Sequence, residues 1–165
     1  MLALRLGLVL LASLLTVSGL ASATPGSAEA ATKVTPKEFA DVIRQAKTVV
    51  IAFEEYRNKR ESKDAVVENR DWIEKLAALV EAGPVVPRPY CFCVSTPSVE
   101  LYGNDGLILK LSLHHESKLR SFGQIQGDFE IGAERSSAIR ALIDAERPNA
   151  RERTDPLVTA PKRAR

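Results

Sequence analysis

The stretch from Ser98 to His114 carries a period-two pattern on both sides of a short turn that is bounded by glycines. Val99 and Leu101 recur at alternate positions before the turn, and after it every second residue is a leucine: Leu107, Leu109, Leu111 and Leu113. Such alternation is typical of strands with one buried face. The stretch therefore predicts an antiparallel β-hairpin, and any fold of this chain has to cover the apolar face of that hairpin.

The turn, Gly103-Asn104-Asp105-Gly106, sets the register of the hairpin. Placing Tyr102 opposite Leu107 would put the apolar set of one strand beside the polar set of the other. A three-residue loop, with Gly106 in the left-handed region, avoids this mismatch. We therefore expect these cross-strand pairs: Tyr102 with Ile108, Leu101 with Leu109, Glu100 with Lys110, and Val99 with Leu111.

Both cysteines and both histidines of the chain lie close to this hairpin. Extending the same ladder brings Cys93 near His115, although Pro97 cannot donate to a ladder and leaves open which face the cysteines occupy. In a regular strand Cys91 and Cys93 would be roughly 6.6 Å apart along the axis. A disulfide between them would therefore be strained, or the strand would have to break there.

Cys91, Cys93, His114 and His115 form a candidate metal or thiol-redox site, because thiolate and imidazole ligands suit Zn²⁺ or copper. Two features speak against it. The C-x-C spacing is tighter than is usual in structural zinc sites, and neighbouring histidines of one strand point to opposite faces, so that only one could join unless the strand ends there. In the alternative interpretation, the cysteines pack as small hydrophobic side chains and no cofactor is bound.

Ser95-Thr96-Pro97-Ser98, ahead of the hairpin, resembles the proline-bearing segment that faces the active site in thioredoxin-like proteins. The resemblance covers only this hairpin. Glu54-Glu55-Tyr56-Arg57 stands where a C-x-x-C motif would follow the first strand. No active site is therefore inferred from the resemblance.

The sequence shows no catalytic constellation: there is no nucleophile turn of the G-x-S-x-G type and no glycine-rich loop ahead of a helix. The net charge of +2 gives no bulk electrostatic reason to bind nucleic acid. We therefore expect a non-enzymatic binding or structural module, with a metal-binding or thiol-redox protein as the alternative. The candidate surface for a partner protein is the polar face of the hairpin: Glu100, Tyr102, Lys110 and His114.

The first residues predict export. A basic start, MLALRLG, is followed by an apolar run through Leu20 and by Ala21-Ser22-Ala23, as in a secretory signal peptide. The run is too short and too interrupted for a membrane span. We expect a signal peptide over residues 1–23 and a periplasmic or secreted protein without a transmembrane segment, whose partner is an envelope or extracellular protein.

The rest of the chain predicts one α+β domain over residues 35–146, between a flexible lead-in (24–34) and a disordered basic tail (147–165). Its sheet is expected to be small and mainly antiparallel, with about three helices packed mostly on one face. The expected elements begin with a helix that Thr35 caps and that ends near Lys47, followed by a strand over 48–56. Residues 64–68 either form a short strand, which we favour, or open the next helix. After them come a helix from Asn69 to Gly83, an extended proline-rich connector, a loop over 121–132 with a short strand at 128–131, and a helix over 134–146.

Overall fold

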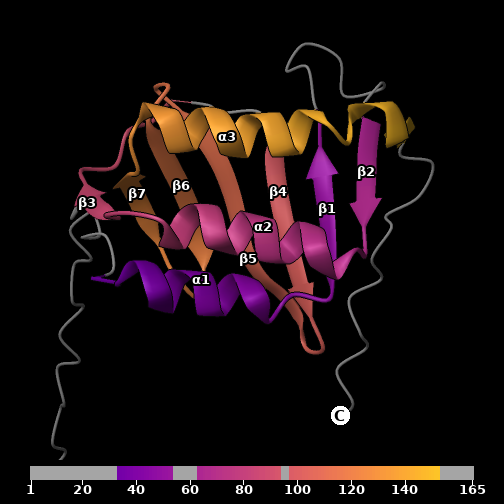
Figure 1. Ribbon diagram of the computed structural model, residues 1–165, viewed down its shortest axis with the longest axis horizontal. Helices are drawn as coiled ribbons and strands as arrows, with labels where there is room; N and C mark the ends of the chain where they lie inside the picture. The colour runs from indigo at the N-terminus through magenta and orange to yellow at the C-terminus, as the bar shows by residue number, and fades with distance from the viewer. Residues whose placement is uncertain (1–32, 54–62, 94–96, 153–165) are drawn as a thin grey trace, which may run out of the picture.

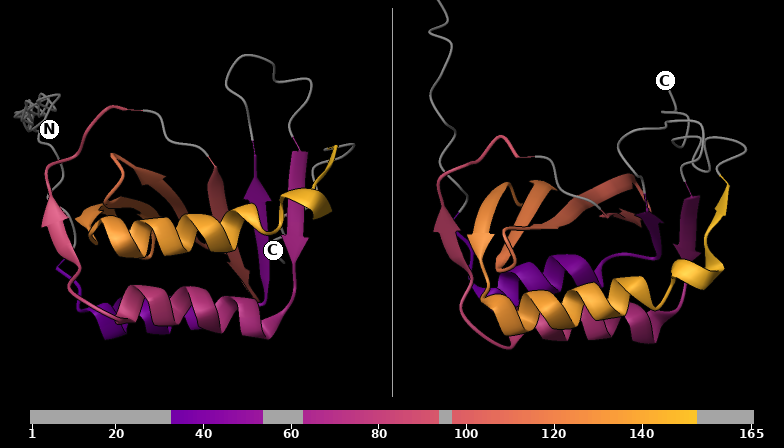
Figure 2. Two further views of the ribbon diagram at one scale, coloured as in Figure 1. Left: turned by 45° about the horizontal axis from the view of Figure 1, so that its top comes forward. Right: turned by 90° about the horizontal axis from the view of Figure 1, so that it is seen from above.

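The structure is a computed structural model that describes residues 33–53, 63–93 and 97–152. Eight strands of this part of the chain form one sheet, and every neighbouring pair is antiparallel. Three helices cover one face of the sheet (Figures 1 and 2), which confirms the predicted α+β fold. The elements are α1 (Pro36–Arg44), β1 (Thr48–Ala52), β2 (Lys63–Val67), α2 (Arg70–Glu81), β3 (Val86–Arg88), β4 (Ser98–Gly103), β5 (Gly106–His114), β6 (Lys118–Gly123), β7 (Gly127–Glu130), α3 (Ala133–Asp144), η2 (Arg147–Asn149) and β8 (Arg151–Glu152).

Local sequence signals start the first two helices where they were expected. The Thr35 side chain accepts from the Glu38 amide while the Glu38 carboxylate accepts from the Thr35 amide, so the predicted capping box is present. Asn69 caps α2 by accepting from the Asp71 amide. The first helix ends at Arg44, a little before the predicted end near Lys47.

The strands lie in the order β3-β7-β6-β5-β4-β1-β2-β8, so β3 forms one edge beside β7, and the last strand, β8, forms the other edge beside β2. The segment at 64–68, which was expected to be a strand, pairs as β2 with β1. The apolar side chains of β1, β4, β5 and β6 meet the helices and form one core. Within it, Phe39 of α1 packs edge-to-face on Phe129 of β7, with ring centroids 5.4 Å apart.

The predicted register of the central hairpin is right along its length and wrong at its tip. Leu101 pairs with Leu109, Glu100 with Lys110 and Val99 with Leu111, as expected. Tyr102, however, pairs with Leu107, and Gly103 pairs with Gly106. The turn is therefore two residues long, and a bulge at Ile108 restores the register that a longer loop was expected to provide. As a result Ile108 is buried and Leu107 is exposed.

Three segments have more strand than the sequence predicted. Lys118–Gly123 forms β6, of which Ser121–Gly123 was expected to be loop. The connector at Val86–Arg88 pairs with β7 as an edge strand, a position that tolerates Pro87. The ordered chain also continues beyond Glu146, where the predicted tail begins, because η2 leads into β8 and β8 pairs with β2.

No helix in the described part of the chain is long and apolar enough to cross a membrane. The predicted signal peptide, residues 1–23, lies outside the described residues, as do most of the lead-in and the end of the tail.

The bulge predicts a strict requirement for glycine at position 123. Gly123 has φ +112, and a Cβ there would lie 2.3 Å from the carbonyl oxygen of Ile108. Gly106 has a similar φ of +113 but open space around it, so it is a matched control. We expect Gly106→Ala to cost about 1–2 kcal/mol from backbone strain alone. Gly123→Ala should cost clearly more, because the bulge must also move. Urea denaturation measures both, and equal costs would contradict the close approach.

Candidate functional site

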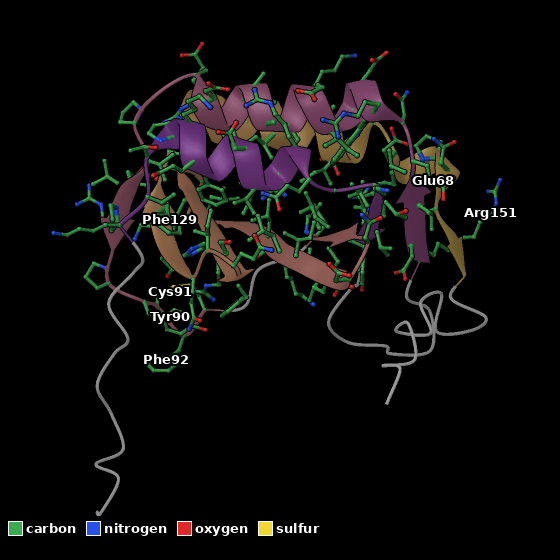
Figure 3. The ribbon with its side chains drawn as sticks, turned by 90° about the horizontal axis from the view of Figure 1, so that it is seen from below. Glu68, Tyr90, Cys91, Phe92, Phe129 and Arg151 are labelled. Atoms are coloured by element: carbon green, nitrogen blue, oxygen red, sulfur yellow. A yellow bond between two sulfur atoms is a disulfide. The ribbon has the colours of Figure 1, made fainter. Side chains whose placement is uncertain are left out.

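The cysteines lie over the face of the sheet that the helices leave open. After β3 the chain turns across this face, and the Cys91 amide donates to the Asp128 carboxylate of β7 at 2.9 Å. Figure 3 shows Tyr90, Cys91 and Phe92 on the side of the sheet away from the helices. Residues 91–93 are not part of a strand. The sequence predicts that a disulfide between Cys91 and Cys93 is strained unless the strand breaks there, and the chain is indeed irregular at this point.

Two sulfurs and two imidazoles meet at the end of β5. Cys91 and Cys93 form a disulfide, with their Cα atoms 5.5 Å apart. The Nδ1 atom of His114 lies 3.5 Å from the Cys91 sulfur and 3.3 Å from the Cys93 sulfur. The Nε2 atom of His115 lies 3.2 Å and 3.1 Å from the same two sulfurs. One potential ligand atom from each of the four residues thus lies within 4.8 Å of the other three.

Both histidines reach the sulfurs because the strand ends between them. β5 stops at His114, and His115 and Glu116 follow with φ of +50 and +60. Two successive non-glycine residues in this conformation are uncommon, and such strain concentrates at functional sites. The turn rotates His115 out of the alternation, so that its imidazole lies on the same side as that of His114, with ring centroids 5.0 Å apart. The end of the strand at His114 is the condition under which the sequence permits both histidines to join the cysteines.

A buried ion pair between Arg120 of β6 and Asp128 of β7 supports the segment of residues 90–93, which we call the cysteine loop. The Arg120 Nε atom lies 2.7 Å from Asp128 Oδ1, and Nη2 lies 3.0 Å from Oδ2, so the pair is bidentate. The same guanidinium donates to the carbonyl of Cys93 at 2.6 Å and to the carbonyl of Cys91. Arg120 therefore holds the backbone on both sides of Phe92 in place.

Arg120 also contacts the cysteine side chains. Its Nη2 atom lies 3.2 Å from the Cys91 sulfur and 3.8 Å from the Cys93 sulfur. The two sulfurs are therefore not equivalent, because a cationic donor is closer to one of them.

Asp128 also faces His114. The carboxylate Oδ1 lies 3.4 Å from His114 Nε2, although that buried nitrogen finds no hydrogen-bond partner among the described residues. Burial lowers the pKa of His114, and the nearby carboxylate opposes this effect without cancelling it. Burial alone would raise the pKa of Asp128, but hydrogen bonds from Arg120 and the Cys91 amide more than offset it, so this pKa lies below its usual value. A neutral imidazole thus lies between an ionised carboxylate and the sulfurs.

Aromatic side chains surround the disulfide on the solvent side. Phe92, between the two cysteines, is 95% exposed, and Tyr90 and Phe122 are 39% and 37% exposed. The ring centroid of Tyr90 lies 5.5 Å from that of Phe92 and 6.3 Å from that of Phe122. The Arg120 guanidinium stacks on the Tyr90 ring, 4.4 Å from its centroid. These three rings form an exposed aromatic cluster beside the sulfurs.

The four residues of the predicted partner surface on the hairpin do not form one exposed surface, because His114 is separate from the other three. Glu100 binds Lys110 at 2.7 Å and accepts from the Tyr102 hydroxyl at 2.8 Å, so these three residues form one hydrogen-bonded group on the open face. His114, the fourth residue of that surface, is only 6% exposed and belongs to the cysteine cluster instead. A partner-binding role of the hairpin face stays a prediction.

Sequence reasoning singled out all four sulfur and imidazole residues but neither Arg120 nor Asp128. Arg120 lies opposite Asp128 in the ladder between β6 and β7, and opposite Ser112 in the ladder between β6 and β5. This register could not be derived while part of β6 was expected to be a loop. The signal that could have found the pair is the strand character of Lys118–Gly123, with Leu119 facing the core and Arg120 the opposite side.

Comparisons with protein-family models, with curated proteins and with solved structures returned no significant match. The function of the protein is therefore inferred from the geometry of the site.

The Arg120–Asp128 pair predicts a large difference between a buried and an exposed carboxylate. Asp128→Asn leaves Arg120 buried without a counter-charge, and we expect a loss of about 3 kcal/mol in the free energy of unfolding. The matched control is Asp144→Asn. The partner of Asp144 is Arg147, whose guanidinium lies 2.8 Å away and whose side chain is 59% exposed. Loss of this exposed pair should cost less than about 1 kcal/mol. Thermal and urea denaturation measure both, and similar costs would contradict a supporting role for the pair.

The turn after β5 predicts a stabilising substitution. Glycine tolerates positive φ without steric penalty, so Glu116→Gly should raise the free energy of unfolding by about 1 kcal/mol. Ser117→Gly is the control, since Ser117 is not among the described residues with positive φ and glycine there only adds freedom to the unfolded chain. A Glu116→Gly variant that is less stable than the parent protein in thermal denaturation would show that the turn is not strained.

Proposed function

We propose that the reduced protein binds one thiophilic transition-metal ion, Zn²⁺ in the first place, through Cys91, Cys93, His114 and His115. The observation that carries this proposal is the convergence of four ligand atoms within 4.8 Å from two segments of the chain. Zn–N and Zn–S bonds of about 2.0 and 2.3 Å imply ligand separations of roughly 3.3–3.8 Å in a tetrahedral site. The sulfur–nitrogen distances of 3.1–3.5 Å are close to that range.

The surroundings of His114 support this assignment. A metal-binding histidine usually directs its second ring nitrogen at a carboxylate, which orients the ring and selects the tautomer. His114 turns Nδ1 to the sulfurs and Nε2 to Asp128. With its proton on Nε2, the imidazole would offer the Nδ1 lone pair to the ion, and its lowered pKa keeps it neutral.

Charge balance favours a divalent ion over a monovalent one. Two thiolates neutralise Zn²⁺, and the positive charge of Arg120 is already balanced by Asp128 at 2.7 Å. A monovalent ion such as Cu⁺ would leave one uncompensated negative charge beside the buried His114, and uncompensated charge at a buried site is costly.

The expected role of the ion is structural, within an exported binding module. Four protein ligands complete the tetrahedral coordination of zinc. They leave no coordination position open for water or substrate, which a catalytic zinc ion needs. The ion would join the cysteine loop to the β5–β6 turn and hold the exposed Phe92 in one place. We propose that this loop contacts an envelope or extracellular protein, in keeping with the predicted signal peptide.

The experiment is metal binding by the reduced protein. Equilibrium dialysis against Zn²⁺, with elemental analysis, should give one ion per chain. Replacing one of four ligands removes about a quarter of a binding free energy of roughly 10–16 kcal/mol, so Cys93→Ser should weaken binding by about 100-fold or more.

Glu116→Gln is the matched control, because it alters an acidic neighbour of His115 outside the cluster, and it should bind as the parent protein does. Co²⁺ in place of Zn²⁺ should give the visible spectrum of a tetrahedral thiolate complex. Sub-stoichiometric uptake, or an unchanged zinc affinity of Cys93→Ser, would reject the proposal, and preferential retention of Cu⁺ would reject the choice of zinc.

A further inference from the structure

The sulfurs of Cys91 and Cys93 lie close to the imidazoles of His114 and His115 even when the two sulfurs form a disulfide. With the Cys91–Cys93 disulfide closed, all four sulfur–nitrogen distances remain between 3.1 and 3.5 Å. Arg120 still holds the carbonyls of both cysteines, and Asp128 still holds the Cys91 amide. The frame of the site therefore exists with the sulfurs in their oxidised form, and metal binding and disulfide formation use the same two atoms.

We infer that the structural metal site is controlled by redox chemistry: an external disulfide oxidises Cys91 and Cys93, and the ion leaves. This inference rests on the proposed function, because it needs an ion to release. The oxidant is a compound with an accessible S–S bond, either a small-molecule disulfide or a disulfide of another exported protein. Such bonds are common outside the cytosol, where the protein is expected to work.

The reaction balances without any further reagent. One cysteine thiolate attacks a sulfur of the external disulfide, forms a mixed disulfide and expels the first external thiolate. The second cysteine thiolate then attacks the cysteine sulfur of that mixed disulfide and expels the second external thiolate. Two electrons pass from the cysteines to the external disulfide, and the products are the Cys91–Cys93 disulfide, two external thiolates and the free ion.

The geometry assigns the first attack to Cys93. Arg120 Nη2 lies 3.2 Å from the Cys91 sulfur but 3.8 Å from the Cys93 sulfur. A charge-assisted hydrogen bond draws electron density from a thiolate and makes it a weaker nucleophile. Both cysteines are half-buried, so neither is excluded by burial. Cys93 therefore becomes the site of the mixed disulfide, and Cys91 closes the intramolecular bond.

Release follows because oxidation removes both thiolates at once. The two remaining ligands are His114, which is buried, and His115, which is exposed at the end of the strained turn. Loss of half of the ligands lowers affinity by more than about 1,000-fold, since each contributes a large share of the binding free energy. His115 is the ligand on the solvent side, so the ion leaves past it.

The experiment adds oxidised glutathione to the zinc-bound protein and follows zinc with a colorimetric chelator while thiols are counted. One zinc should appear for every two protein thiols lost, and dithiothreitol with added zinc should restore binding. Reduced glutathione at the same concentration is the control, because it can compete for zinc but cannot oxidise the protein, and it should release little.

The order of attack is tested on the same protein without any substitution. Sub-stoichiometric iodoacetamide is added to the zinc-bound form, and tandem mass spectrometry locates the first adduct, which should lie on Cys93 several-fold more often than on Cys91. An excess on Cys91 would overturn the assigned order.

The outcomes separate this inference from the proposed function. If the reduced protein takes up no zinc, both fail. If it takes up one zinc and keeps it after both thiols are oxidised, the redox inference alone fails. Release of zinc without loss of thiols would also overturn it, because the ion would then be leaving by simple competition.

Discussion

The contact between Arg120 and Asp128 determines the architecture of the open face of the sheet. Two opposite charges, almost fully buried side by side, are stable only while they stay paired and while their remaining hydrogen-bonding atoms find partners. Arg120 satisfies its other donors with the carbonyls of Cys91 and Cys93, and Asp128 accepts the Cys91 amide. The path of the cysteine loop follows from this requirement.

The same strands serve the core and the site. In β5, Leu111 and Leu113 face the helices while Ser112 and His114 face the cysteine loop, and in β6 Leu119 and Arg120 divide in the same way. A change of register by one residue would exchange these faces and destroy both at once. The stability of the core and the geometry of the sulfur and imidazole cluster are therefore coupled through the pleat of the sheet.

Much of the fold could be predicted from local patterns, and the errors have a common cause. The helix caps at Thr35 and Asn69 and the pairing of Leu101 with Leu109 depend on nearby residues or on strict alternation. The segment Lys63–Val67 is compatible by its local pattern with a strand or a helix start, and its pairing with β1 decides for the strand. The bulge at Ile108 and the pairing of Val86–Arg88 depend on neighbours that are distant in sequence. Gly123, for example, approaches the Ile108 carbonyl closely, and no local signal in either segment indicates this contact.

By itself, the sequence determined the residue types of the candidate site: two cysteines, two histidines and a hairpin that brings them near one another. Only the tertiary structure decided that both histidines take part, because this needs β5 to end at His114 and the next residues to adopt positive φ. It also decided that Arg120 and Asp128 support the site, since their proximity arises from the pairing of β6 with β7. Alternation specifies which side chains share a face of one strand, but the position of that face relative to a distant loop depends on the packing of the whole sheet.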